Sequence, residues 1–339
     1  MRPRSLRLIV LFLALIAVAP AQVPQIGIID IYGLRKVKEQ TVRKVLGLTP
    51  GSPLPSSKGD VETRLEAIDG VVNARLEAAC CDDQKRAILY VGIEEVGAPH
   101  FNYHNPPETD LHLPEEISAT YRKFLQAASA AGKAGMAQED LSRGHSLMAD
   151  PEVRAIQMQF VELADAHLAE LQKVLRGSAD NDQRAIAAYV IGYATAKSRV
   201  LNDLQYALQD SDDTVRANAL RSLAAFSVLA AKDPKSELKI PPVWFVELLN
   251  SLIWSDRNNA AITLVTLTES RDPKVLTLIS ERAVPSLIEM ASWTHLPHAL
   301  PGYIVLGRVL GIPEPELQKL WSEDKRDVVI QRARKLTKR

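Results

Sequence analysis

The chain has 339 residues, of which 46% are hydrophobic and 24% are charged. These values are close to those of ordinary globular proteins, and they exclude a disordered chain, a collagen-like repeat and a small disulfide-rich scaffold. The 41 basic residues balance 41 acidic ones, so no overall charge draws the protein toward nucleic acid. The length is sufficient for two domains of common size.

The first 21 residues have the three parts of a secretory signal peptide. Three arginines supply the positive start, and Leu8 to Val18 is an unbroken apolar run. Ala19-Pro20-Ala21 then places small residues before a cleavage point at Gln22. Because the apolar run is shorter than the roughly 20 residues of a membrane span, we expect cleavage, with an uncleaved anchor as the alternative. The sequence thus predicts an exported protein, either periplasmic or extracellular.

Residues 24–97 have the pattern of a small α/β module. Strand character is present over 26–32, from Gly70 onward and over 86–94. Apolar residues at helical spacing predict helices over 38–48 and 60–68. The predicted order is therefore strand, helix, helix, strand, strand.

This order resembles the POTRA domain. The matching residues are Gly33, Leu48-Thr49-Pro50-Gly51, Leu65, Ile68-Asp69-Gly70-Val71 and Val91-Gly92-Ile93-Glu94-Glu95. The resemblance implies an exported module that binds partners, often by pairing a partner strand with a sheet edge. Such modules usually precede a β-barrel, and no later segment here alternates as barrel strands do. A module that only caps the rest of the chain is the alternative.

Cys80 and Cys81 are the only cysteines, and they are adjacent. Three states are open: two reduced thiols, a vicinal disulfide that would make them a candidate redox pair, and a bridge to another chain. Two adjacent thiols lack the spacing of a zinc motif.

Residues 98–114 form a proline-rich linker. Pro99, Pro106, Pro107 and Pro114 exclude a regular helix, so an extended connector is expected. Since the segment has few signals for burial, we expect the two halves of the protein to be separable.

Residues 115–339 are expected to be helical, because apolar side chains recur there at helical spacing. The expected helices cover 115–132, 137–148, 151–176, 182–195, 197–209, 213–231, 241–254, 257–269, 273–293, 299–310, 314–322 and 325–337. The helix over 273–293 is expected to break near Pro285.

A short motif recurs in this helical region. Asp212-Asp213-Thr214-Val215-Arg216 is followed by Ala219 and Leu223, and related copies begin at Asp180, Asp150 and Asp256. The motif resembles the first helix of the HEAT repeat, which implies a HEAT-like α-solenoid of stacked helix pairs. The predicted fold is therefore mainly α, a HEAT-like α-solenoid preceded by a small POTRA-like α/β domain.

Four motif residues are expected to stabilise the stack. Asp212 would cap its helix and Val215 would lie in the core. Arg216 and Arg184 would each reach the aspartate of the neighbouring unit. On this basis Arg216→Ala is expected to cost about 1–2 kcal/mol.

No phosphate-binding loop, dinucleotide fingerprint, zinc helix or nucleophile elbow occurs in the sequence. We therefore expect a protein that is not an enzyme and that holds no metal and no cofactor. The pair His295 and His298 suits either a metal site or a histidine-lined turn.

Two sets of residues are candidate partner surfaces. Trp244, Phe245, Trp254 and Trp293 cluster in a chain that is poor in aromatic residues, and such rings are common binding hot spots. Their alternative role is packing between stacked helices. The stretch 325–339 carries seven basic residues and one acidic residue, which suits either an anionic lipid surface or a solvated terminal helix.

The sequence therefore favours an exported scaffold of the cell envelope. It would bind protein partners, and not nucleic acid, through its helical-repeat surface and a sheet edge. Two alternatives stay open: a ligand-binding or enzymatic protein built on the helical solenoid, and an accessory factor of outer-membrane protein assembly.

Overall fold

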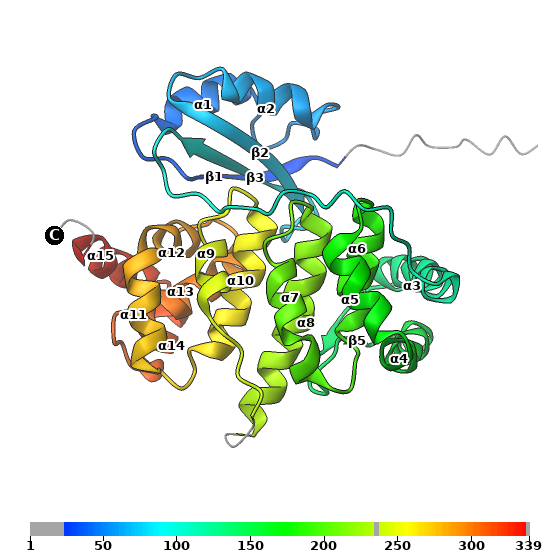
Figure 1. Ribbon diagram of the computed structural model, residues 1–339. Helices are drawn as coiled ribbons and strands as arrows, with labels where there is room; N and C mark the ends of the chain where they lie inside the picture. Colours follow the sequence, from blue (N-terminus) through cyan, green and yellow to red (C-terminus); the bar gives the residue numbers. More distant parts are fainter. Residues whose placement is uncertain (1–23, 234–236, 337–339) are drawn as a thin grey trace, which may run out of the picture.

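The computed structural model describes residues 24–233 and 237–336. The signal-peptide segment, residues 1–21, lies outside these ranges, as do Lys338 and Arg339. The described chain is mainly helical, with a small three-stranded sheet near its N-terminal end (Figure 1), as the sequence predicts. No helix within the described ranges combines the length and the apolar character needed to cross a membrane.

The N-terminal module contains β1 (Ile26–Tyr32), α1 (Glu39–Leu46), α2 (Lys58–Glu66), β2 (Val71–Ala79) and β3 (Ala87–Glu95). The strand order is β1-β3-β2, with β3 parallel to β1 and antiparallel to β2. Alternation along β3 gives the sheet two buried faces. Leu89, Val91 and Ile93 pack with α1 and α2, whereas Ile88 and Tyr90 belong to the core of the helical part.

The turn after β1 depends on a glycine and a buried carboxylate. Gly33 has a φ of +85°, and a Cβ there would lie 2.0 Å from the carbonyl oxygen of Ile93. Three N–H groups that follow in this turn, those of Arg35, Lys36 and Val37, donate to the carboxylate of Glu95 at 2.6, 2.8 and 3.0 Å. Burial by itself would raise the pKa of Glu95, but these hydrogen bonds favour the charged carboxylate. The net result is a lowered pKa, so Glu95 is charged in the folded protein.

The helical part contains thirteen helices within the described ranges. They are α3 (Glu115–Lys133), α4 (Pro151–Ala166), α5 (Leu168–Gly177), α6 (Asn181–Ile191), α7 (Lys197–Ala207), α8 (Asp213–Lys232), α9 (Val243–Leu248), α10 (Trp254–Leu267), α11 (Pro273–Arg282), α12 (Val284–Ala291), α13 (Leu296–Val309), α14 (Glu314–Ser322) and α15 (Arg326–Leu336). Helices α6, α8, α10 and α13 form an inner row in which each packs on the next, and α5, α7, α9 and α11 pack on that row from one side.

Aspartates fix the starts of the helices that carry the repeated motif. Asp150, Asp180 and Asp212 each accept hydrogen bonds from the N–H groups two and three residues later, at the starts of α4, α6 and α8. Asp272 caps α11 in a similar way. The caps satisfy N–H groups that a helix leaves without partners, so the motif determines where each of these helices begins.

Several expected helices are corrected by the structure. The helix over 137–148 is wrong, since this segment contains β4 (Glu139–Asp140) and β5 (Leu147–Met148). Gly144 there has a φ of +75°, which ends helical geometry, and Gln157 accepts a hydrogen bond from the N–H of Met148 at 2.7 Å. The helix over 151–176 is interrupted at His167, and the expected helix over 241–254 extends only from Val243 to Leu248.

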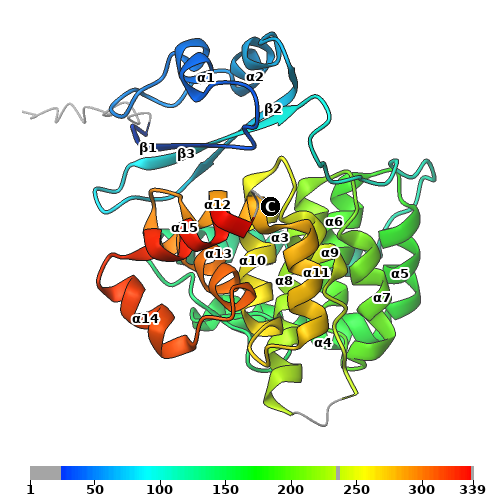
Figure 2. The same ribbon diagram turned by 90° about the vertical axis from the view of Figure 1, so that its left-hand side faces the viewer.

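The sheet of the module lies across one end of the helices (Figure 2). The linker that follows β3 runs along the same ends, and its Phe101 and Leu113 are buried. The N–H of His104 donates to Gln209 O at 2.7 Å, and the N–H of Leu113 donates to Gln183 Oε1 at 2.8 Å. The linker is therefore packed along the helices and not extended into solvent.

Candidate functional site

Buried arginines connect successive helices of the inner row. Arg184 on α6 forms two hydrogen bonds with the carboxylate of Asp210, at 2.8 and 2.9 Å, and donates to Ser178 O. Arg216 on α8 binds Asp256, with its Nε donating to both carboxylate oxygens at 3.0 and 3.1 Å, and its Nη1 donates to Asp210 O. Both arginine side chains are 2% exposed. Each arginine thus closes the turn before its own helix and reaches a carboxylate of the next unit.

Burial dominates the electrostatics of the second pair. It raises the pKa of Asp256, and the Arg216 guanidinium opposes this by favouring the charged carboxylate. The guanidinium also lies over the ring of Tyr103, 4.4 Å from its centre. Val215, beside this arginine, is fully buried. The pair is therefore part of the core.

A third arginine extends this arrangement to the module. Arg257 on α10 donates to Ser251 O and pairs with Glu289 at 2.8 Å. The other carboxylate oxygen of Glu289 accepts a hydrogen bond from Gly33 N–H at 3.1 Å. The Arg257 guanidinium lies 4.5 Å from the centre of the Tyr32 ring. Glu289 therefore joins the helical part to the end of β1.

Two carboxylates of the sheet bind the other half of the chain near the start of a helix. Glu77 binds in the first turn of α10, and Asp30 binds two residues before α13 begins. Glu77 on β2 accepts hydrogen bonds from the N–H and hydroxyl of Ser255, at 2.8 and 2.9 Å. Asp30 on β1 accepts them from the N–H and hydroxyl of Thr294, at 2.9 and 2.7 Å. Helices α10 and α13, which begin beside these residues, have no side-chain cap at their own N-cap positions. Burial raises the pKa of both carboxylates.

The aromatic residues expected to form a partner surface lie mostly inside the molecule. Trp254 stacks on Tyr90 of β3, with ring centres 4.5 Å apart, and Trp293 also contacts Tyr90. Trp293 is 2% exposed and Phe245 is fully buried. Trp244 is half-buried and packs against Phe101 of the linker. These rings therefore have the packing role that the sequence left open as the alternative, with Tyr90 of the sheet against Trp254 and Trp293.

The histidine pair also belongs to the contact between the two halves. The Tyr90 hydroxyl lies 2.7 Å from His298 Nδ1, and the His295 and His298 rings are 4.3 Å apart. Burial, with His295 as a second cause, lowers the pKa of His298 to about 4. No group of three or more His, Cys, Asp or Glu side chains in residues 24–233 and 237–336 could hold a metal ion.

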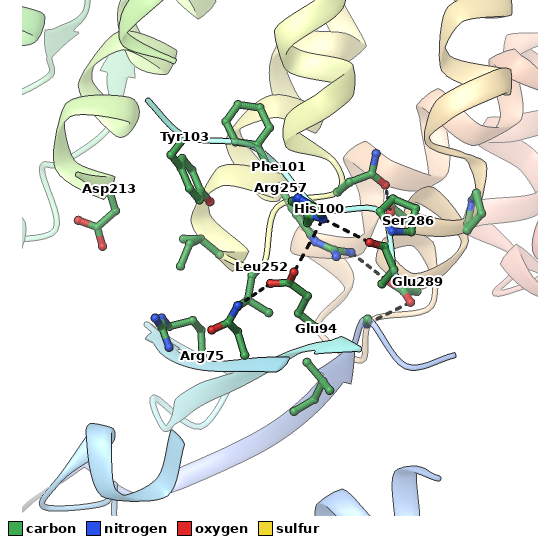
Figure 3. A pocket seen from close by; sticks show the side chains of 18 of the residues that line it. Arg75, Glu94, His100, Phe101, Tyr103, Asp213, Leu252, Arg257, Ser286 and Glu289 are labelled. Carbon is green, nitrogen blue, oxygen red and sulfur yellow. Dashed lines mark hydrogen bonds and ion pairs between the residues drawn. The ribbon is translucent and has the colours of Figure 1, made fainter. Parts of the chain in front are cut away.

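A cavity of about 630 Å³ lies beside this contact, between the module, the linker and the helix ends. Its volume is within the range of about 300–1,000 Å³ that is common for ligand sites. Residues from all three parts line it, among them Arg35. Figure 3 labels further lining residues: Arg75, Glu94, His100, Tyr103, Asp213, Leu252, Arg257, Ser286 and Glu289. The cavity exists only where the two halves meet.

The charges of the cavity walls are mixed. Arg35 and Arg75 come from the module, whereas Asp213 comes from the first turn of α8. Glu94 accepts a hydrogen bond from Asn73 at 3.0 Å and remains partly exposed. A ligand that carries both signs of charge matches these walls better than a purely anionic or purely cationic one.

The two edges of the sheet differ. Along β2, the N–H of Ala74 donates to Glu66 at 3.1 Å and the N–H of Leu76 donates to Glu62 at 2.7 Å. These carboxylates of α2 occupy backbone donors that an added strand would need. β1 is the opposite edge, and on its outer side the N–H of Ile26 donates to Ser52 O at 2.8 Å.

Cys80 and Cys81 lie between β2 and β3, at the other end of these strands from the cavity, and a disulfide joins them. Cys80 is exposed and Cys81 is half-buried. The structure therefore has the vicinal disulfide among the three states considered.

Sequence reasoning identified Asp212, Val215, Arg216 and Arg184 but missed Asp30, Glu77 and Glu289. One signal was present, since Asp30 and Tyr32 alternate on one face of a strand otherwise rich in isoleucine. A carboxylate on such a face needs a partner, although the sequence does not say which. The chain matches no protein-family profile and no curated protein sequence.

Proposed function

We propose that this protein is an exported scaffold of the cell envelope, with a POTRA-like module followed by a HEAT-like α-solenoid. The strand order β1-β3-β2 with two helices on one face supports the first assignment. The row of α6, α8, α10 and α13, with arginine–carboxylate pairs between successive units, supports the second.

The scaffold would hold an extended segment of a partner protein in the cavity between the module, the linker and the helix ends, which we call the junction cavity. The observation that carries this proposal is the cavity itself, because the sheet, the linker and the helix ends all contribute walls of mixed charge. Helical repeats commonly bind extended chains, and mixed charge selects a segment by its pattern of acidic and basic residues. A partner strand would add along β1 beyond Ile26, whose N–H already donates to Ser52 O, since Glu62 and Glu66 occupy the β2 edge.

Site-specific crosslinking in the native host tests this proposal. A photoreactive residue at position 100, on the exposed side of the cavity, should capture a discrete partner, whereas one at exposed position 173 on α5 should not. Asp213→Lys should reduce capture from position 100. Asp182→Lys is the matched control, because Asp182 is also exposed in the first turn of an inner-row helix but does not line the cavity. Equal capture by the two variants would contradict the proposal.

A further inference from the structure

The module has a second hollow, which shares no lining residue with the junction cavity. Its volume is about 780 Å³, and it lies between the start of α1, the end of α2 and the end of β3. Lys36, Lys38 and Arg64 line it, and all three are exposed. Val96, which also lines it, is 68% exposed, so a large apolar side chain meets solvent beside three cations.

The carboxylates around this hollow do not cancel its positive charge. Glu95 is 4% exposed, and its oxygens accept the N–H groups of Arg35, Lys36 and Val37. Asp69 is the one exposed acidic side chain among the residues that line the hollow. The surface offered to a partner is therefore basic with an apolar centre.

Helix α15 presents a similar surface. Val329, Ile330 and Ala333 are buried, and the helix packs on α12 and α13. Val328, Arg332, Lys335 and Leu336 are exposed and are spaced four, three and one residues apart, which places them along one side of the helix. Arg332 pairs with Glu316 at 3.2 Å, yet half of its side chain stays exposed.

The two surfaces lie at the same end of the molecule. The turn from β1 into α1 and the helix α15 are both on the left in Figure 1, and both face the viewer in Figure 2. The junction cavity opens under the sheet and shares none of Lys36, Lys38 or Arg64.

We propose that this end of the protein docks on an anionic membrane surface. Cations near such a surface are attracted by its negative potential, and exposed valine and leucine side chains can enter the boundary between headgroups and acyl chains. The basic side chains of the hollow and of α15 match anionic headgroups, and the exposed apolar side chains beside them match the boundary with the acyl chains. The proposal does not depend on the partner segment in the junction cavity.

Vesicle co-sedimentation tests the proposal with a chain that begins at Gln22, which keeps every described residue. Vesicles that contain phosphatidylglycerol should bind the protein, and vesicles of phosphatidylcholine alone should not. Replacing Lys36, Lys38 and Arg64 by Gln should weaken binding by about fivefold for each cation removed. The matched control replaces exposed Lys58, Lys85 and Lys173, which lie outside the hollow, and should bind like the wild type.

Two results would overturn the proposal. One is equal binding of the hollow variant and the control variant to anionic vesicles. The other is an absence of vesicle binding together with capture of an acidic peptide such as polyglutamate, which would assign the surface to a protein partner. Circular dichroism of both variants establishes that a loss of binding is not a loss of fold.

Discussion

Three charged side chains in the core, Arg184, Arg216 and Arg257, organise the helical part at the scale of single residues. An arginine is tolerated there because its guanidinium has five N–H donors and meets a carboxylate and backbone carbonyls together. The sequence suggested that Arg216 ties neighbouring turns at a modest energy. The structure indicates a larger loss of stability when Arg216 is removed, because Asp256 is 1% exposed and would keep an uncompensated charge.

Arg216→Ala should therefore lower the free energy of unfolding by about 3–5 kcal/mol, instead of the about 1–2 kcal/mol expected from the sequence. Urea denaturation measures the change. In the double variant Arg216→Met, Asp256→Leu, most of the loss should be recovered, since neither charge stays buried. A single variant with a loss below 1 kcal/mol would mean that the pair does not hold the stack together.

His298 gives the contact between sheet and helices a dependence on pH. Burial lowers the pKa of His298 to about 4, whereas the imidazole of the unfolded chain titrates near pH 6.5. Below that pH the unfolded chain therefore binds a proton that the folded chain does not bind. The contribution of His298 to stability is therefore complete above about pH 6.5 and is lost as the pH falls toward 4. A protonated His298 donates from both ring nitrogens, so its Nδ1 cannot accept a hydrogen bond from the Tyr90 hydroxyl, 2.7 Å away.

His298→Asn tests this dependence, because asparagine keeps a hydrogen-bond acceptor but does not titrate. The stability advantage of the wild type over this variant should shrink between pH 6.5 and pH 4. Asp30 and Glu77, with raised pKa values, shift stability in the opposite sense, and His145 shifts it in the same sense. These groups are present in both chains and cancel in the difference. A difference that is constant over this range would exclude His298 as its source.

At the scale of elements, helix caps come from two sources. Asp150, Asp180 and Asp212 cap their own helices, and a sequence shows such caps because donor and acceptor are two or three residues apart. Glu77 caps α10 from a strand 178 residues earlier in the chain. Local patterns therefore predicted the starts of α4 and α8, whereas the supports of α10 and α13 could not be predicted.

Glu77→Ala should cost about 1 kcal/mol of unfolding free energy, which is typical of a lost helix cap. Glu77→Gln should cost less, since an amide oxygen still accepts from Ser255. Denaturation followed by tryptophan fluorescence measures both, because Trp254 lies beside Ser255 in the first turn of α10. Wild-type stability of Glu77→Ala would show that the contact contributes nothing to α10.

The same limit explains the misread segment over 137–148. Its apolar residues have helical spacing, but Gln157 and the positive φ of Gly144 fix a two-stranded turn instead. The role of the aromatic cluster stayed open in the sequence for a related reason. A tryptophan that packs against another part of the same chain has the same sequence signature as one that binds a partner.

At the scale of the whole molecule, the module and the helices share one contact surface. The linker has the prolines of an extended connector, and its few signals for burial predicted separable halves. Three contacts act against that expectation. Phe101 of the linker is buried, Tyr90 of the sheet stacks on Trp254, and Glu77 of the sheet caps α10. The order of strands and helices could be predicted from the sequence. The cavity could not, since residues from Arg35 to Glu289 meet in it through tertiary contacts.

The central claim is that sheet, linker and helices form one unit with a fixed junction. Differential scanning calorimetry of the chain from Gln22 to Arg339 tests it most directly. We predict one cooperative transition whose calorimetric and van't Hoff enthalpies agree, and whose midpoint falls in Asp30→Ala and in Glu77→Ala. Two transitions, with the module melting at a temperature that neither substitution changes, would contradict the claim.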